Sequence, residues 1–191
     1  VVDFILNTYA ALPKGLIPFH QFESDVSTAF QDQVIQAQSM FGSDVKIHFT
    51  IQEDFESIIN TAISSSSTDI SKISFSYQSE ESNAFCFNDK GEVIKEGEEF
   101  LKRPAGHGAI LENLNKIESD IVLIKNIDNV QYNSKSEETE TTWKITMGLL
   151  TQFKSELIAL SKGFSTNGLL ELNKKYQFIS PHLIDEMTVD S

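Results

Sequence analysis

This chain has few of the features that mark secreted, membrane-bound or disulfide-stabilised proteins. It contains a single cysteine, Cys86, which cannot form an internal disulfide, so a reducing, cytoplasmic location is expected. No apolar run approaches the roughly 20 residues that a membrane-spanning helix needs, so no membrane partner is expected. Asp3 interrupts the apolar start and no basic run precedes it, which is not the pattern of a signal peptide.

Positive charge is also scarce. The chain has 15 lysines and arginines against 28 acids, a net charge of −13, which would repel a nucleic-acid backbone from most of its surface. The one arginine, Arg103, follows Lys102 just before a glycine turn. It is either a stray arginine or part of a local positive site for a small phosphate ligand. The four histidines lack metal-site spacing, and no second cysteine could assist them.

The remaining composition is that of a globular protein. With 191 residues, 40% of them apolar and 23% charged, the chain suits one domain or slightly more. It starts at Val1 rather than Met, and we interpret it as a fragment or a processed product. We expect an α/β core over residues 1–165 and a C-terminal helix and tail over residues 166–191.

Hydrophobic periodicity predicts the core. Val45–Ile51 and Ile73–Tyr77 alternate as strands, and the spacing of apolar residues from Phe55 to Ile63 predicts a helix between them. This strand–helix–strand order favours parallel pairing. The run Asp120–Asn126 is the most continuously apolar strand and is expected at the sheet centre. The predicted fold class is therefore α/β, with a mainly parallel mixed sheet flanked by helices.

Further segments have clear local patterns. The spacing of apolar residues predicts a helix from about Phe22 to Phe41 that stops at Gly42, and a short helix from Gly108 to Ile117. Asn88–Gly91 is typical of a hairpin turn. A long helix follows residue 137, and its apolar stripe is expected to be core: Trp143, Met147, Leu150, Phe153, Leu157, Leu160 and Phe164.

Four elements could carry chemistry. Lys14 lies beside a glycine and could place a compact charge on a phosphate, although for this residue taken alone a surface lysine is the simpler explanation. Gln78 follows a strand, and its amide could read a base edge or be solvated. Gly106 and Gly108 would let a backbone approach a ligand, or merely turn the chain. Asp128 follows the apolar run and could bind a metal ion or cap its own turn.

The order of these elements adds information that the spacing alone does not hold. The sequence resembles the UDP-sugar pyrophosphorylase (uridylyltransferase) group of GT-A-like nucleotidyltransferases in four motifs: Pro13-Lys14-Gly15, Phe75-Ser76-Tyr77-Gln78, Pro104-Ala105-Gly106-His107-Gly108 and Asp128-Asn129. It resembles more closely a bacterial family of domains of unknown function, number 4301. The blocks LPKGLIPFH, KIHFTIQ, ISFSYQ and RPAGHGAILENLN…DIVLIKNIDNV carry this resemblance, which covers roughly residues 12–150.

The resemblance implies a Rossmann-like GT-A core and a role for each motif. Lys14 would be the catalytic residue that neutralises phosphate, and Asp128 would bind Mg²⁺. The substrate, a nucleoside triphosphate or nucleotide sugar, would be held by Gln78, Arg103, Gly106, His107, Gly108 and Asn129. The implied reaction is attack of a sugar phosphate on the α-phosphorus with release of pyrophosphate, which depends mostly on positioning and charge stabilisation.

The chain departs from that pattern in two places. Too little chain precedes Leu12 for the Gly-rich phosphate loop, and a second metal-binding acid is not identifiable, with Asp185 and Asp190 lacking any motif. Loss of one preorganised donor can cost about 10²–10³ in rate, so we expect this chain alone to be inactive and to bind nucleotides weakly or undetectably, and the full-length protein to bind better. The alternatives are a non-catalytic nucleotide- or nucleotide-sugar-binding module, and an α/β interaction domain without a ligand.

Overall fold

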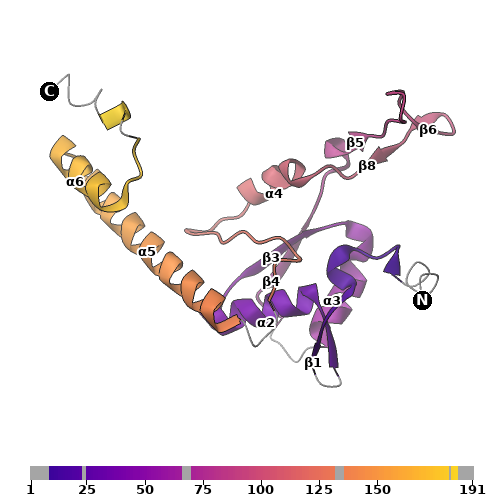
Figure 1. The fold of residues 1–191 in the computed structure, drawn as a ribbon, viewed down its shortest axis with the longest axis horizontal. Helices are drawn as coiled ribbons and strands as arrows, with labels where there is room; N and C mark the ends of the chain where they lie inside the picture. The colour runs from indigo at the N-terminus through magenta and orange to yellow at the C-terminus, as the bar shows by residue number, and fades with distance from the viewer. Residues whose placement is uncertain (1–8, 23–24, 66–69, 132–135, 181, 185–191) are drawn as a thin grey trace. The chain divides into compact units, whose positions relative to one another are not determined.

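The computed structural model describes residues 9–22, 25–65, 70–131, 136–180 and 182–184 (Figure 1). The helices are α2 (Ala29–Phe41), α3 (Glu56–Ser64), α4 (Leu111–Asn115), α5 (Ser136–Lys162) and α6 (Thr166–Tyr176). Four short 3-10 turns are η1 (Lys14–Leu16), η2 (Glu53–Phe55), η3 (Glu80–Ser82) and η4 (His107–Ile110). The strands are β1 (Pro18–Phe22), β2 (Asp25–Thr28), β3 (Ile47–Ile51), β4 (Ile73–Tyr77), β5 (Ala84–Phe85), β6 (Lys95–Glu96), β7 (Glu99–Phe100) and β8 (Lys102–Arg103).

The chain divides into two compact units, Val1–Ser136 and Glu137–Ser191. In the second unit, α6 packs against the C-terminal half of α5 through Phe153, whose ring centroid lies 4.9 Å from that of Tyr176. None of the residues that we expected to form a core stripe is fully buried: four are half-buried, while Leu150 at 42%, Leu157 at 39% and, just after α5, Phe164 at 66% are exposed. That prediction was wrong because α6 covers only one side of the helix. Within the described part of the chain, no helix is long and apolar enough to cross a membrane.

The core of the first unit forms around the predicted strand–helix–strand unit. β3 and β4 pair in parallel with Ile47 opposite Ile73, as predicted, and α3 lies between them in sequence (Figure 1). One face of the pair joins α2, α3 and η1 in a single apolar cluster, whose buried members are Leu16, Phe30, Val34, Ile51, Ile59 and Ile63. The hydroxyls and the imidazole of the strands lie on the other face, because side chains alternate along a strand.

A single mainly parallel sheet, however, does not form. The described strands make four separate two-stranded sheets, and only β3–β4 is parallel. The chain is therefore α/β with small, mixed sheets. The hairpin turn at Asn88–Gly91 is present, since the Asn88 N–H donates to the Glu92 carbonyl and Phe87 bridges to Val93.

The run Asp120–Asn126 is not a strand, which corrects the main error of the sequence prediction. Its side chains alternate between half-buried and exposed, with Ile124 at 66% exposure, so the chain is extended but not central. The carbonyls of Asn126 and Ile127 accept from the Gln33 side chain of α2, at 2.9 and 3.2 Å, instead of from a neighbouring strand. Apolar alternation indicates an extended backbone. It does not indicate which groups form hydrogen bonds with that backbone.

The helix predicted from Phe22 begins later, at Ala29, because Pro18–Phe22 and Asp25–Thr28 form the antiparallel β1–β2 pair. Thr28 starts the helix with a capping box: its hydroxyl accepts from the Gln31 N–H, and the Gln31 side chain accepts from the Thr28 N–H. The Gln31 amide also donates to the Ala62 carbonyl near the end of α3. The helix ends at Gly42 as predicted, with a φ of 86° that favours glycine.

Replacing Thr28 with alanine should therefore destabilise the first unit. The change removes the hydroxyl that caps α2, which typically costs about 1 kcal/mol. Urea unfolding followed by circular dichroism measures it. Thr142→Ala is a matched control, because Thr142 is exposed within α5 and alanine is the better helix former there. Equal midpoints for the two variants would contradict the capping role.

Candidate functional site

Gly15 brings the first predicted motif into place. In η1, Leu16 inserts into the core at 6% exposure, and Gly15 lies flat against the Phe30 ring and Ile127. A Cβ on Gly15 would lie 2.6 Å from Phe30 Cε2 and 2.7 Å from Ile127 Cγ1. Only a residue without a side chain fits this contact. It places Lys14, whose side chain is 66% exposed, directly beside the turn that carries Asp128.

The Asp128 turn is held from the other side by α2. Two buried glutamines reach its backbone: Gln33 donates to the carbonyls of Asn126 and Ile127, and Gln36 donates to that of Gln131 at 3.0 Å. The Asn129 N–H closes the turn on the Asn126 carbonyl. Lys125 is half-buried, donates to the Gln36 side chain at 3.2 Å, and has a pKa lowered by that burial.

Lys14 and Asp128 form an ion pair, with 2.5 Å between Lys14 Nζ and Asp128 Oδ2. The Lys14 ammonium holds the pKa of Asp128 below its usual range, with a further contribution from the backbone N–H of Asp128 itself. The His107 imidazole adds a weaker electrostatic effect in the same direction. Asp128 is therefore ionised at neutral pH. Both side chains are well exposed, so the pair contributes little to stability.

The glycines of the Gly106-His107-Gly108 loop have a different environment from Gly15. A Cβ at Gly106 or Gly108 would meet nothing within 4 Å, and Gly106 has an ordinary φ of −71°. Neither packing nor backbone strain within the described chain requires glycine at these positions. Their missing side chains instead leave the loop backbone open to an approaching group.

Gln78 lies at the carboxyl end of β4. Its N–H donates to the Ile51 carbonyl at the end of β3, and its side-chain amide donates to Ser82 at 3.3 Å. The glycine loop connects to this strand end through Asn113 of α4, which donates to the carbonyl of Tyr77 at 2.8 Å. Sequence reasoning missed Asn113, because a single amide in a short helix forms no recognisable pattern.

The described residues thus bring together some of the predicted site and leave the rest apart. Lys14 and Asp128 are in direct contact, His107 has a weaker electrostatic effect on Asp128, and Gln78 is linked to the His107 loop by Asn113. Asn129 directly follows Asp128 in the turn and is exposed. Arg103 lies in β8 opposite Ala84, and no interaction found among the described residues joins it to Asp128. Asp185 and Asp190 lie outside the described residues.

The residues present do not form a complete metal site. No group of three or more histidine, cysteine, aspartate or glutamate side chains that could hold a metal ion occurs in the described part of the chain. Asp128 supplies one exposed carboxylate. Mg²⁺ commonly takes one or two protein carboxylates and completes its shell with waters and substrate phosphates. The donor set therefore fits a metal ion that arrives with a phosphate ligand.

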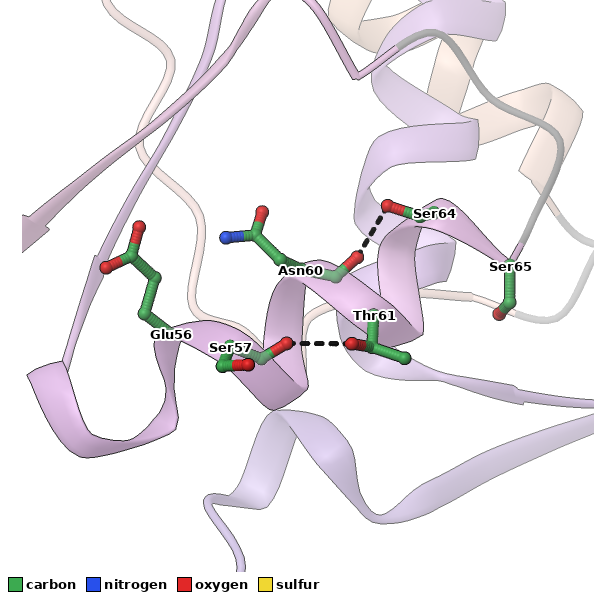
Figure 2. A pocket seen from close by; sticks show the side chains of 6 residues that line it. All are labelled: Glu56, Ser57, Asn60, Thr61, Ser64 and Ser65. Carbon is green, nitrogen blue, oxygen red and sulfur yellow. Dashed lines mark hydrogen bonds between the residues drawn. The ribbon is translucent and has the colours of Figure 1, made fainter.

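A shallow hollow elsewhere on the first unit is lined by one face of α3, as Figure 2 shows. Three of its hydroxyls donate to the helix backbone: Thr61 to the Ser57 carbonyl, Ser64 to that of Asn60 and Ser65 to that of Ala62. Glu56 accepts from the Tyr77 hydroxyl at 2.6 Å. The lining residues include an acid and no cation, which does not favour an anionic ligand.

Replacing Gly15 with alanine should destabilise the first unit by about 1–3 kcal/mol, because the new methyl group overpacks a filled contact. Gly106→Ala is the matched control and should leave stability unchanged, since its Cβ would meet open space. Denaturant titration of both variants measures the difference. A Gly15→Ala variant as stable as Gly106→Ala would show that η1 does not depend on this contact.

His48 should make stability depend on pH. Burial lowers the pKa of His48 from its usual value of 6.5, so the folded state prefers the neutral ring. Its contribution is fully present above the unfolded pKa and is lost as the pH falls from about 6.5 through the lower folded value. Urea midpoints measured across this range should decline, and His48→Gln should reduce the slope. His182→Gln, at an exposed position, is the control. A slope unchanged by His48→Gln would contradict the assignment.

Comparison with known proteins addresses the resemblance seen in the sequence. No curated protein and no solved structure matches the chain. The sequence profile of a domain of unknown function (DUF4301) matches residues 3–189, nearly the whole chain. The chain therefore belongs to the DUF4301 family, as its sequence blocks predicted.

Proposed function

We propose that this chain supplies the nucleotide-binding core of a nucleotidyltransferase that transfers a nucleotidyl group from a nucleoside triphosphate to a sugar phosphate. The observation that carries the proposal is the pairing of Lys14 with Asp128 across 114 positions of sequence, with His107 acting on the same carboxylate. These three side chains come from three of the four motifs shared with the UDP-sugar pyrophosphorylase group. The Lys14–Asp128 contact is what that resemblance would require of a common site.

Each residue has a role that its environment supports. Lys14 carries a compact, exposed charge that can turn from Asp128 to a phosphate oxygen. The open backbone at Gly106 and Gly108 admits the base and ribose, and Gln78 offers both a donor and an acceptor to a base edge. Arg103, His107 and Asn129 complete the polar surroundings of the ligand. Asp128 would hold Mg²⁺ against the phosphates.

The reaction would proceed by displacement at the α-phosphorus. An oxygen of the sugar phosphate forms the new bond to phosphorus, the bond to the β-phosphate bridging oxygen breaks, and pyrophosphate leaves with that electron pair. Mg²⁺, when bound, supplies charge neutralisation on the phosphate oxygens. The protein contributes position and charge: Lys14 neutralises phosphate, while the glycine loop and Gln78 orient the nucleoside.

A second candidate is a non-catalytic nucleotide- or nucleotide-sugar-binding module on the same site. The observation that favours it is that, among the described residues, Asp128 belongs to no group of three or more side chains that could hold a metal ion. One acid can retain a metal–nucleotide complex, whereas transfer also needs the attacking and leaving oxygens to be stabilised together. Release of pyrophosphate from a nucleoside triphosphate and a sugar phosphate separates the two candidates.

Asp128→Asn should weaken the Mg²⁺-dependent part of UTP binding, since a neutral amide is a poorer ligand for a hard cation. Titration calorimetry with UTP, with and without Mg²⁺, measures this difference. Asp89→Asn is the matched control, because it removes the same charge from an exposed turn. If the wild-type protein binds UTP equally well in both conditions, and Asp128→Asn does the same, Asp128 caps its own turn and holds no metal ion.

A further inference from the structure

Asn113 connects the glycine loop to the parallel strand pair. It is the buried residue of α4, at 8% exposure, while Leu111 in the same helix is 56% exposed. Its Nδ2 atom donates to the Ser76 hydroxyl at 3.0 Å and to the Tyr77 carbonyl at 2.8 Å. Both acceptors belong to the last two residues of β4. The Asn113 side chain is therefore buried in order to donate two hydrogen bonds. The geometry of those bonds, rather than apolar contact, sets its position.

The position of Asn113 determines what these bonds control. η4 begins at His107, directly after Gly106, and continues into α4 without a break. Fixing Asn113 therefore fixes the start of the glycine loop, seven residues earlier. Gln78 immediately follows Tyr77, the residue whose carbonyl accepts from Asn113. The same bond thus sets the distance between the two elements that would hold the base and ribose.

Ser76 links this anchor to a titratable group. The Ser76 hydroxyl lies 2.9 Å from His48 Nε2, 3.2 Å from the Thr50 hydroxyl and 3.0 Å from the Asn113 amide. The other ring nitrogen of His48 lies 2.8 Å from the Ser74 hydroxyl. A continuous chain of hydrogen bonds therefore runs from β3 across β4 to α4.

We infer that Asn113 is a positioning residue, which sets the glycine loop against Gln78 for a bound nucleotide and transmits to that loop the state of the His48–Ser76 hydrogen bond. This inference rests on the proposed function, since the nucleotide is the ligand that the loop would hold. Asn113 itself does not touch the ligand. It acts through the backbone that it fixes.

The groups that contact His48 are neutral. They are the Ser74 and Ser76 hydroxyls, with Thr50 and Asn113 one bond further along the chain of hydrogen bonds. The charged residues of the surrounding elements are Lys46 and Lys72, just before the two strands, and the Glu112–Lys116 pair around α4. Burial is the cause that lowers the pKa of His48. When His48 gains a proton, both ring nitrogens become donors, so Ser76 must accept from His48 as well as from Asn113.

The first test needs no ligand. The amide resonances of Gly106 and Gly108 are followed by NMR from about pH 8 to pH 5, the range in which histidine titrates. All proteins in this test carry His107→Gln, which removes the imidazole that lies between the two glycines. In this background the loop amides should shift together with the His48 ring. Adding Asn113→Ala should abolish this correlated shift, and adding Asn115→Ala, at an exposed position of the same helix, should keep it. Loop amides that ignore His48 in the His107→Gln protein, or follow it once Asn113→Ala is added, overturn the inference.

A second variant decides the case if Asn113→Ala fails to fold. Ser76→Ala removes the shared hydroxyl but leaves the Asn113 bond to the Tyr77 carbonyl. The loop should then stay in place, while its amides no longer follow the titration of His48. Correlated shifts that persist in Ser76→Ala would contradict the proposed path through that hydroxyl.

The third test uses UTP with Mg²⁺ in titration calorimetry at several pH values. Asn113→Ala should raise Kd by roughly tenfold, as expected for the loss of a well-placed anchor, and should remove any pH dependence that follows His48. Asn115→Ala should change Kd by less than about twofold. A lowered Tm with unchanged Kd and unchanged pH dependence would show that Asn113 is merely structural. Absence of UTP binding to the full-length wild-type protein would overturn the proposed function, while the NMR experiment still decides whether Asn113 couples the loop to His48.

Discussion

The contact of Gly15 with Phe30 and Ile127 is the constraint on which the candidate site depends. It joins three segments that are distant in sequence: the first 3-10 turn, α2, and the turn that carries Asp128. Because the backbone of η1 lies directly on the apolar core, Lys14 needs no long reach to meet Asp128. Burial of Leu16 and Ile127 therefore provides the energy that positions two exposed charges. Their own attraction is too well solvated to do so.

The structure holds the two halves of the site by different forces. The Lys14 side is set by apolar packing, which is short-range and intolerant of added volume. The Gln78 and Gly106 side is set by buried amide hydrogen bonds from Asn113, and the Asp128 turn by those from Gln33 and Gln36. Buried amides specify geometry strongly, because leaving one unsatisfied costs more than a typical hydrogen bond contributes.

The sequence predicted those parts of the fold that local pattern controls. β3, α3, β4, the Gly42 stop and the Asn88–Gly91 turn each follow from periodicity or turn chemistry within a few residues. The start of α2 was misplaced although Thr28 and Gln31 already formed the pattern of a capping box. Attention to that four-residue signal, rather than to the apolar stripe of the helix, would have found the β1–β2 pair before it.

The remaining errors concern which residues hydrogen-bond or pair with one another, which a sequence pattern does not reveal. The run from Asp120 has the composition of a strand, but the carbonyls of Asn126 and Ile127 accept hydrogen bonds from the Gln33 side chain of α2. Gln33 lies on the buried face of that helix, where a polar residue requires a hydrogen-bond partner. The sequence does not indicate which partner it has. Lys14 and Asp128 were predicted to share a site only because four motifs occurred in a familiar order. Spacing alone left each with an equally simple surface explanation.

Folding alone makes different demands on Gly15 than on Gly106 and Gly108. A chain selected only for folding would retain Gly15, since any side chain there collides with the core, but would be free to drift to alanine at Gly106 and Gly108. In a mutational scan that measures protein abundance, substitutions of Gly15 would therefore lower abundance, whereas substitutions of Gly106 or Gly108 by alanine would not. Substitutions at Gly106 or Gly108 that leave abundance intact but impair the cell would identify the loop as the part of the protein that serves something outside its own structure.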